Sequence, residues 1–210
     1  MGQKVNPTSF RIGSLINWKS NWIVDKKTIG KFLVLDKKIR RFIINFLPRF
    51  IVSSIEITRS DNLLDIVIYT TAIGLLIGKE KKNLIALENG LKKLDNSKKI
   101  NVIPRPIKNP AIDAQSIANF IASQIENRQS FRVVQKSAIR KALKSGVYGI
   151  KTSVSGRLNG ADIARTEKYQ FGILPLHTIS SDISFAKSIA KTTYGIIGVK
   201  VEFVKVLKEN

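Results

Sequence analysis

Residues 53–96, SSIEITRSDNLLDIVIYTTAIGLLIGKEKKNLIALENGLKKLDN, carry the pattern that decides the fold. The first half alternates polar with apolar, mostly β-branched residues on both sides of residues 60–62, which predicts two strands joined by a tight turn. The second half follows a short glycine-containing segment with leucines at helical spacing: Leu84, Leu87, Leu91 and Leu94. The pattern therefore predicts a β-hairpin, a glycine loop and an amphipathic helix, in that order.

Further elements are predicted on both sides of this segment. Upstream, residues 36–50 (DKKIRRFIINFLPRF) predict a helix that Pro48 ends. Downstream, residues 98–110 (KKINVIPRPIKNP) predict a strand that runs into three prolines, which is the best domain boundary in the chain. Two more helices are predicted over residues 113–128 and 129–146, and the pattern after them changes to strands.

These elements predict an α+β protein in three parts. Residues 1–36 are expected to form an N-terminal arm, and residues 37–108 a first domain with the order helix, hairpin, glycine loop, helix and strand. Residues 109–210 are expected to form a C-terminal α+β domain. In that domain two helices pack on a small, mainly antiparallel sheet.

The charge of the chain points to a polyanionic partner. Lysine and arginine total 36 against 15 acidic residues, so the net charge of the 210 residues is +21 and the isoelectric point is about 10.3. A folded protein with that much positive charge repels itself unless a partner supplies negative charge, and nucleic acid is the commonest such partner. The cations run along the whole chain rather than beside a lipid anchor, which favours nucleic acid over a membrane surface.

Several classes of function are excluded by composition. The chain has no cysteine and one histidine, so we expect no disulfide, no thiolate or histidine metal site, and no metal or cofactor. No paired carboxylates and no nucleophile–base set stand out, and His177 is expected to be a hydrogen-bonded turn residue, so we expect no enzyme. The N-terminus lacks a hydrophobic signal core and no apolar run is long enough for a membrane span, which predicts an intracellular protein without a membrane partner.

Residues 128–146 place a cation at every fourth position: Arg128, Arg132, Lys136, Arg140 and Lys144. On the same helix one stripe is apolar and is expected to be buried: Phe131, Val134, Ala138 and Ala142. Like charges four residues apart repel, and residues 129–151 contain no acid that could pair with them. A solvated helix usually mixes both signs of charge, so the single sign favours phosphate as the counterion over an ordinary solvated face.

The glycine loop consists of Gly78, Lys79, Glu80 and Lys81. Only three residues separate Gly74 from Gly78, and a glutamate follows the lysine, so the loop is not a nucleotide-binding P-loop. The order of elements instead matches a KH type-two domain, in which a GXXG loop clamps single-stranded RNA. Because Lys81 replaces the second loop glycine and Glu80 is acidic, two readings stay open: a loop that grips RNA, or a KH fold kept for packing.

Residues 155–172, SGRLNGADIARTEKYQFG, contain a glycine-rich turn flanked by cations: Arg157, Arg165 and Lys168. Arginines at such a turn fork onto phosphates. They are equally placed to pair with Asp162 and Glu167 within the chain. Spacing alone leaves both readings open.

Five blocks together resemble one family, the bacterial-type third protein of the small ribosomal subunit (ribosomal protein S-three). They are MGQKVNPTSFRIG, IGLLIGKEKKNL, GIKTSVSGRLNGADIARTEKY, PLHT and TTYGIIGVKV, which start at residues 1, 73, 149, 175 and 192. They occur in the family's order and spacing, so the resemblance covers essentially the whole chain. It implies a KH type-two domain followed by an α+β C-terminal domain.

The resemblance also implies a function. It implies a structural constituent of the small-subunit head that binds small-subunit rRNA beside proteins S-ten and S-fourteen. It places the basic helix on the channel by which mRNA enters, with proteins S-four and S-five, where the family supports mRNA unwinding during translation. The family's first channel arginine falls on Arg132 and its lysine on Lys136, but its second arginine falls on Val133, which reduces the positive rim.

We therefore expect a cytoplasmic or organellar ribosome of bacterial type as the location. The candidate channel residues are Arg132, Lys136, Arg128, Arg140 and Lys144. The candidate rRNA-binding residues are Gly2, Gln3, Lys4, Asn6, Arg11, Lys151, Arg157, Arg165 and Lys168. A free KH-type regulatory RNA-binding protein is the alternative function.

Overall fold

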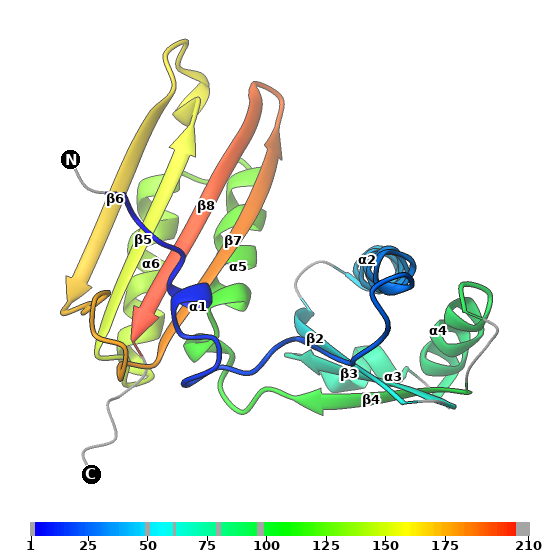
Figure 1. The fold of residues 1–210 in the computed structure, drawn as a ribbon. Coiled ribbons are helices and arrows are strands. Elements are labelled where there is room, and N and C mark those ends of the chain that lie inside the picture. The colour runs from blue at the N-terminus through cyan, green and yellow to red at the C-terminus, as the bar shows by residue number, and fades with distance from the viewer. Residues whose placement is uncertain (1–2, 49–50, 61, 79–80, 96–98, 205–210) are drawn as a thin grey trace. The chain divides into compact units, whose positions relative to one another are not determined.

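The computed structural model describes residues 3–48, 51–60, 62–78, 81–95 and 99–204 (Figure 1). Two compact units account for the chain: Trp18–Lys108, and Met1–Asn17 together with Asn109–Asn210. Each unit combines one sheet with helices, which confirms the predicted α+β class. The first 17 residues of the predicted arm thus group with the C-terminal unit, and residues 18–36 group with the other.

The unit Trp18–Lys108 is built on a four-stranded sheet of order β1-β2-β3-β4. Its strands are β1 (Ser20–Asn21), β2 (Val52–Arg59), β3 (Leu63–Thr70) and β4 (Lys99–Pro106). The predicted hairpin consists of β2 and β3, which pair antiparallel. Strand β1 pairs in parallel with β2, and β4 pairs in parallel with β3.

The helices of this unit are α2 (Ile29–Phe46), α3 (Ile73–Ile77) and α4 (Lys82–Lys92). Helix α2 begins seven residues before the predicted helix, inside the predicted arm. One apolar core joins α2 and α4 to one face of the sheet, with Ile39 and Ile43 of α2, Leu87 and Leu91 of α4, and Ile66 of β3 among its fully or almost fully buried residues. Burying each such side chain contributes about 1.5–3 kcal/mol. The order helix, hairpin, loop, helix and strand is the KH type-two order predicted above.

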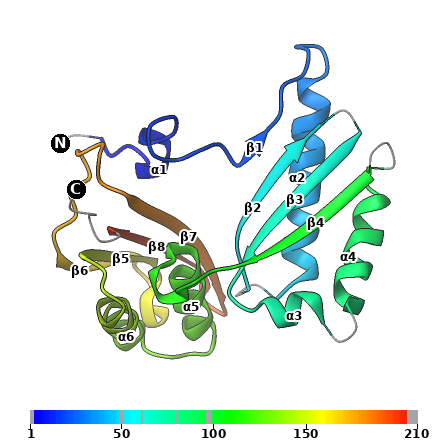
Figure 2. The same cartoon turned by 90° about the horizontal axis from the view of Figure 1, so that it is seen from below.

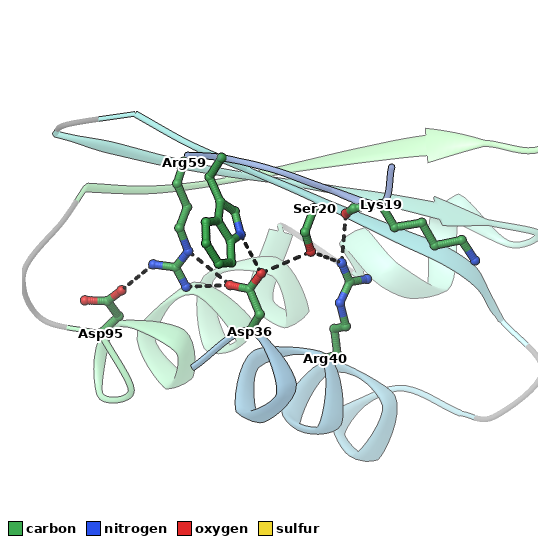
Figure 3. Close-up of polar contacts among 7 residues, drawn as sticks. Lys19, Ser20, Asp36, Arg40, Arg59 and Asp95 are labelled. Atoms are coloured by element: carbon green, nitrogen blue, oxygen red, sulfur yellow. Dashed lines mark hydrogen bonds and ion pairs between the residues drawn. The ribbon is translucent and has the colours of Figure 1, made fainter. Parts of the chain in front are cut away.

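A buried ionic cluster ties the elements of this unit together (Figure 3). The guanidinium of Arg59 donates to Oδ1 of Asp36 from Nε at 3.0 Å and from Nη2 at 2.7 Å, and its Nη1 lies 3.1 Å from Oδ2 of Asp95. The other carboxylate oxygen of Asp36 accepts from the indole N–H of Trp22 at 2.9 Å and from the hydroxyl of Ser20 at 3.1 Å. The cluster therefore joins β1, β2, α2 and the residues that follow α4.

Arg40 of α2 strengthens the same connection between the first strand and the sheet. Its guanidinium donates to the backbone carbonyl of Lys19 and to the hydroxyl of Ser20 (Figure 3). It also donates to the backbone carbonyl of Ile55. Every group involved belongs to the unit Trp18–Lys108. Residues 19–22 are therefore held by side chains of α2 as well as by the short parallel pairing of β1 with β2.

The second unit is an antiparallel sheet of order β6-β5-β8-β7. Its strands are β5 (Gly149–Gly156), β6 (Arg165–Gly172), β7 (Ile183–Thr192) and β8 (Gly195–Val204). Helices α5 (Ala114–Glu126) and α6 (Phe131–Lys144) cover one face, and the N-terminal segment with α1 (Pro7–Phe10) lies on the opposite face (Figures 1 and 2). Short 3-10 turns, η2 (Pro110–Ile112) and η3 (Leu158–Gly160), precede α5 and follow β5.

The core of this unit lies between the two helices and the sheet. The buried positions alternate along the strands, for example Ile150 and Val154 on β5 and Val199, Val201 and Phe203 on β8, all with no exposed surface. The residues between them point to the other face of the sheet. Two helices on a mainly antiparallel sheet is the architecture predicted from the sequence.

Candidate nucleic-acid interface

Helix α6 presents the predicted basic stripe to solvent. Its predicted buried stripe is confirmed, because Phe131, Val134 and Ala138 are each 2% exposed and Ala142 is fully buried. The cations of the opposite stripe, Arg132, Lys136, Arg140 and Lys144, are all exposed. Arg128 precedes the helix in a left-handed conformation, with φ of 61°, and is exposed as well. Val133, which interrupts the positive rim, is also exposed.

One acid does reach the stripe, contrary to the sequence-based expectation. Glu167 of β6 accepts from Arg132, with Nη2 at 3.1 Å from Oε1 and Nε at 3.3 Å from Oε2. It also pairs with Arg165, whose Nε lies 3.3 Å from Oε1. The hydrogen bond from Arg132 holds the pKa of Glu167 below its usual value, and the charges of Arg132 and Arg165 act in the same direction. Arg132 therefore has a counterion within the chain that residues 129–151 do not supply. Binding of the stripe to RNA phosphate stays a prediction.

The pairing with Glu167 positions Arg132 rather than hiding it. The side chain of Arg132 is 58% exposed, and two of its five N–H donors are used on the carboxylate. The next cation of the stripe, Lys136, has its ammonium 5.9 Å from the ring centre of Tyr169, on the same strand as Glu167. Strand β6 thus supports the first half of the stripe, while Arg140 and Lys144 extend into solvent.

The two arginines of residues 155–172 pair with groups of the same chain, which is the intramolecular alternative given above. Arg157 donates from Nε to the carbonyl of Ala161 at 3.0 Å, and its Nη2 lies 3.0 Å from Oδ1 of Asp162. Arg165 pairs with Glu167 as described. Both side chains keep part of their surface exposed, and Lys168 is exposed as well. Their proposed contact with rRNA would use the donors that these pairs leave available.

The face of the second sheet that α5 and α6 leave uncovered, on which the N-terminal segment lies, carries a row of lysines. Strand register places Lys168 and Lys200 on either side of Ser153, and Lys187 opposite Lys200. Lys187 and Lys200 were not predicted as binding residues. Alternation along residues 183–204 could have identified them, because their neighbours Ala186, Val199 and Val201 are buried.

Lys151 and Lys4 extend this basic face toward the N-terminal segment. The pKa of Lys151 is lowered, chiefly by burial and then by the positive charge of Lys4, while Glu202 opposes the shift. Burial disfavours the charged form of a lysine, and the neighbouring cation acts in the same direction.

The N-terminal candidates separate into exposed and buried residues. Gln3, Lys4 and Asn6 are exposed, and the side-chain oxygen of Asn6 caps α1 by accepting from the backbone N–H of Thr8 at 2.9 Å. Gly2 lies outside the described residues. The side chain of Arg11, by contrast, has no exposed surface.

The assignment of Arg11 to rRNA binding is therefore wrong. Its guanidinium donates to four backbone carbonyls, of Ser181 at 2.7 Å, Thr178 at 2.7 Å, Pro7 at 3.1 Å and Leu176 at 3.1 Å. These bonds fasten the N-terminal segment to the loop that contains His177. Arg11 is a structural residue that no phosphate can reach.

The glycine loop joins α3 to α4. Gly78 has φ of 70°, and a Cβ there would lie 2.8 Å from the side chain of Asn83, so this position requires glycine. Asn83 itself donates to the carbonyl of Leu75 at 2.9 Å. Lys81 adopts a left-handed conformation, with φ of 60°, directly before α4. Lys79 and Glu80 lie outside the described residues, and RNA binding by this loop stays a prediction.

Within the described ranges of the chain, no three His, Asp or Glu side chains are grouped so that they could hold a metal ion. None of the helices described there has both the length and the hydropathy of a membrane span.

Comparison with known proteins finds close similarity along nearly the whole chain. The family model for the C-terminal domain of ribosomal protein S3 matches residues 121–203. A small ribosomal subunit protein uS3 from Spiroplasma citri is 50% identical over 211 residues, which cover 98% of this chain and 82% of that protein. The protein of the same name from Staphylococcus saprophyticus is 48% identical over 202 residues, or 96% of this chain and 92% of its own length.

Proposed function

The chain belongs to the uS3 family of small ribosomal subunit proteins, and from that membership we propose how its basic surfaces are used. As a family member it is a structural, non-enzymatic component of the ribosome. We propose that it binds small-subunit rRNA in the head and lines the channel by which mRNA enters. Its location would then be the ribosome, in the cytoplasm of a bacterium or in an organelle of bacterial descent.

The exposed stripe on α6 is the single observation that carries the channel assignment. Lys136, Arg140 and Lys144 are exposed on the face opposite the buried core, and Arg132 is held in place by Glu167. A fixed row of cations attracts a passing RNA backbone without reading its bases. Such contacts favour single strands at the mouth of the channel and so support unwinding. Val133 removes one cation from the rim, and we expect weaker unwinding than in relatives with arginine there.

The rRNA contacts are proposed for the other basic surface. Lys168, Lys187 and Lys200 form a row on the uncovered face of the second sheet, next to Lys151 and Lys4. The grouping of these lysines on one face supports a polyanion partner there, because bound phosphate would reduce the repulsion among them. Proteins S-ten and S-fourteen are proposed as neighbours in the head, and S-four and S-five as neighbours at the channel.

The channel assignment is tested by replacing Arg132 and Lys136 together with alanine. We expect reconstituted ribosomes to translate messages with stable hairpins more slowly while unstructured messages are read at the normal rate. The Lys141→Ala variant is the matched control, because Lys141 is a cation of the same helix whose ammonium lies over the ring of Phe120 at 4.0 Å, away from the stripe. Equal rates on both kinds of message in the double variant would refute the assignment.

A further inference from the structure

A cavity of about 660 Å³ opens at one end of the C-terminal unit, beside the start of α6. Three turns contribute its walls: the turn between α5 and α6, the turn that follows β5, and the turn between β7 and β8. The volume is within the range of small-molecule sites and suits one nucleotide. Arg128 and Arg157 of its lining are candidate RNA-binding residues, but none of the assignments above uses the cavity itself.

Tyr194 provides a flat wall for the cavity. Its ring lies directly on Gly160, where an added Cβ would come within 3.1 Å of the ring. Gly160 also has φ of 77°, so both the close contact and the backbone conformation favour glycine at this position. Tyr194 is nevertheless 59% exposed. The ring thus packs against the backbone at Gly160 while the residue remains accessible, which suits a stacking platform for a base.

The remaining walls combine positive charge with amide groups. Arg128 and Lys191 are exposed cations at the rim, and Arg157 lines the interior and donates to the carbonyl of Tyr194 at 3.4 Å. The one acid in the lining, Glu126, is used locally, because its Oε1 accepts from the backbone N–H of Lys191 at 2.9 Å. Arg157 is also paired with Asp162, which does not line the cavity, so Arg128 and Lys191 are the cations that favour a ligand with a phosphate.

We propose that this cavity binds a single unpaired nucleotide that projects from an RNA helix. The base stacks on Tyr194, the amides of Gln129 and Asn159 reach its edge, and Arg128 and Lys191 contact the flanking phosphates. Sequence-specific RNA recognition uses bases splayed out of a helix in this way, with aromatic stacking and hydrogen bonds to base edges. The inference rests on the proposed function in that RNA is the partner, and it adds a discrete nucleotide site to that function.

The test uses the full chain and a short RNA hairpin with one bulged nucleotide, compared with the same hairpin without the bulge. Stacking on one aromatic side chain contributes about 1–3 kcal/mol per base, so we expect the bulged hairpin to bind roughly tenfold more tightly. Tyr194→Ala should abolish this preference, and Tyr194→Phe should retain it. Tyr148→Ala is the control, because Tyr148 is similarly exposed but does not line the cavity.

Each outcome decides between explanations. Equal binding of both hairpins by the unaltered chain, or a preference that survives Tyr194→Ala, overturns the nucleotide site but leaves general RNA binding intact. Failure to bind either hairpin counts against the proposed function itself. Tight binding of free uridine monophosphate without any bulge preference assigns the cavity to a free nucleotide and overturns the RNA inference. A photoreactive residue at Thr193 that crosslinks only to protein in assembled subunits overturns it too.

Discussion

Replacing Asp36 by asparagine is predicted to weaken the KH unit more than the same exchange at the other acids that the structure describes in it. The carboxylate accepts four hydrogen bonds, two from Arg59 and one each from Trp22 and Ser20, and the side chains of Asp36 and Arg59 are 6% and 2% exposed. An amide has one accepting oxygen, so the donors on the other side lose their acceptor. An unsatisfied buried donor costs about 1–3 kcal/mol, and breaking a buried ion pair about 3–5 kcal/mol.

Asp95 remains beside Arg59 after the exchange, so the expected loss of stability lies near the lower end of the range for breaking a buried ion pair. We therefore expect Asp36→Asn to reduce the free energy of unfolding of this unit by about 3 kcal/mol. For a domain of this size, the melting temperature should fall by about 10–20 °C. The carboxylate of Asp95 lies 3.1 Å from the same guanidinium and limits the effect.

Tryptophan fluorescence isolates the measurement, because both tryptophans of the chain, Trp18 and Trp22, belong to this unit. Urea and thermal unfolding followed by fluorescence therefore report the KH unit alone. Asp65→Asn is the matched control: Asp65 lies on β3, accepts one hydrogen bond from Asn101 at 3.2 Å, and should change stability by less than about 0.5 kcal/mol. A loss for Asp36→Asn no larger than the control's would refute the role given to the cluster.

Three further predictions follow from the C-terminal unit. Arg11→Lys keeps the charge but loses most of the bonds to the carbonyls of residues 176–181. It should destabilise this unit by about 2–3 kcal/mol and speed hydrogen exchange in residues 3–11 and 176–181, and unchanged exchange would contradict it. Glu167→Gln releases Arg132 and Arg165 for phosphate, so RNA affinity should fall more steeply with salt, by roughly 0.7–0.9 log units per log unit of salt for each new contact. Because the pKa of Glu167 is lowered, the Arg132 pairing is complete above the ordinary carboxyl pKa of about 4.3 and is lost only as pH falls through the lower folded value. The NMR signal of the Arg132 Nε–H should therefore stay constant from pH 7 to about pH 4, and a change near neutral pH would contradict this assignment.

Periodicity predicted the elements that bury one apolar face. The hairpin, the helix after the glycine loop and the buried face of α6 were all visible in the spacing of leucine, isoleucine, valine and alanine. The partner of Arg132 was not visible, because Glu167 lies 35 residues later in the chain and reaches the helix only through the pairing of β6 with β5. A search for acids within one element cannot find an acid supplied by a neighbouring strand.

Residue type was a poor guide to exposure for the cations. Arg11 was expected to bind RNA because it is basic and lies in a block typical of the family, yet four carbonyls enclose it. Conversely, Lys187 and Lys200 were overlooked, although strand alternation places both on the uncovered face of the sheet. A buried arginine can be distinguished from a binding arginine only when the position of the surrounding loop is known. For Arg11 that loop is residues 176–181.

The strand order of the C-terminal unit determines when this unit can complete its fold during synthesis. Strand β8 is the last of the described strands to be synthesised, yet it lies inside the sheet, between β5 and β7. Arg11, near the start of the chain, donates to a carbonyl that is synthesised 170 residues later. The KH unit is continuous in sequence and can fold while translation proceeds. The C-terminal unit can complete its sheet only after β8 has left the exit tunnel. Until then it remains an open, strongly cationic chain that needs protection from other polyanions.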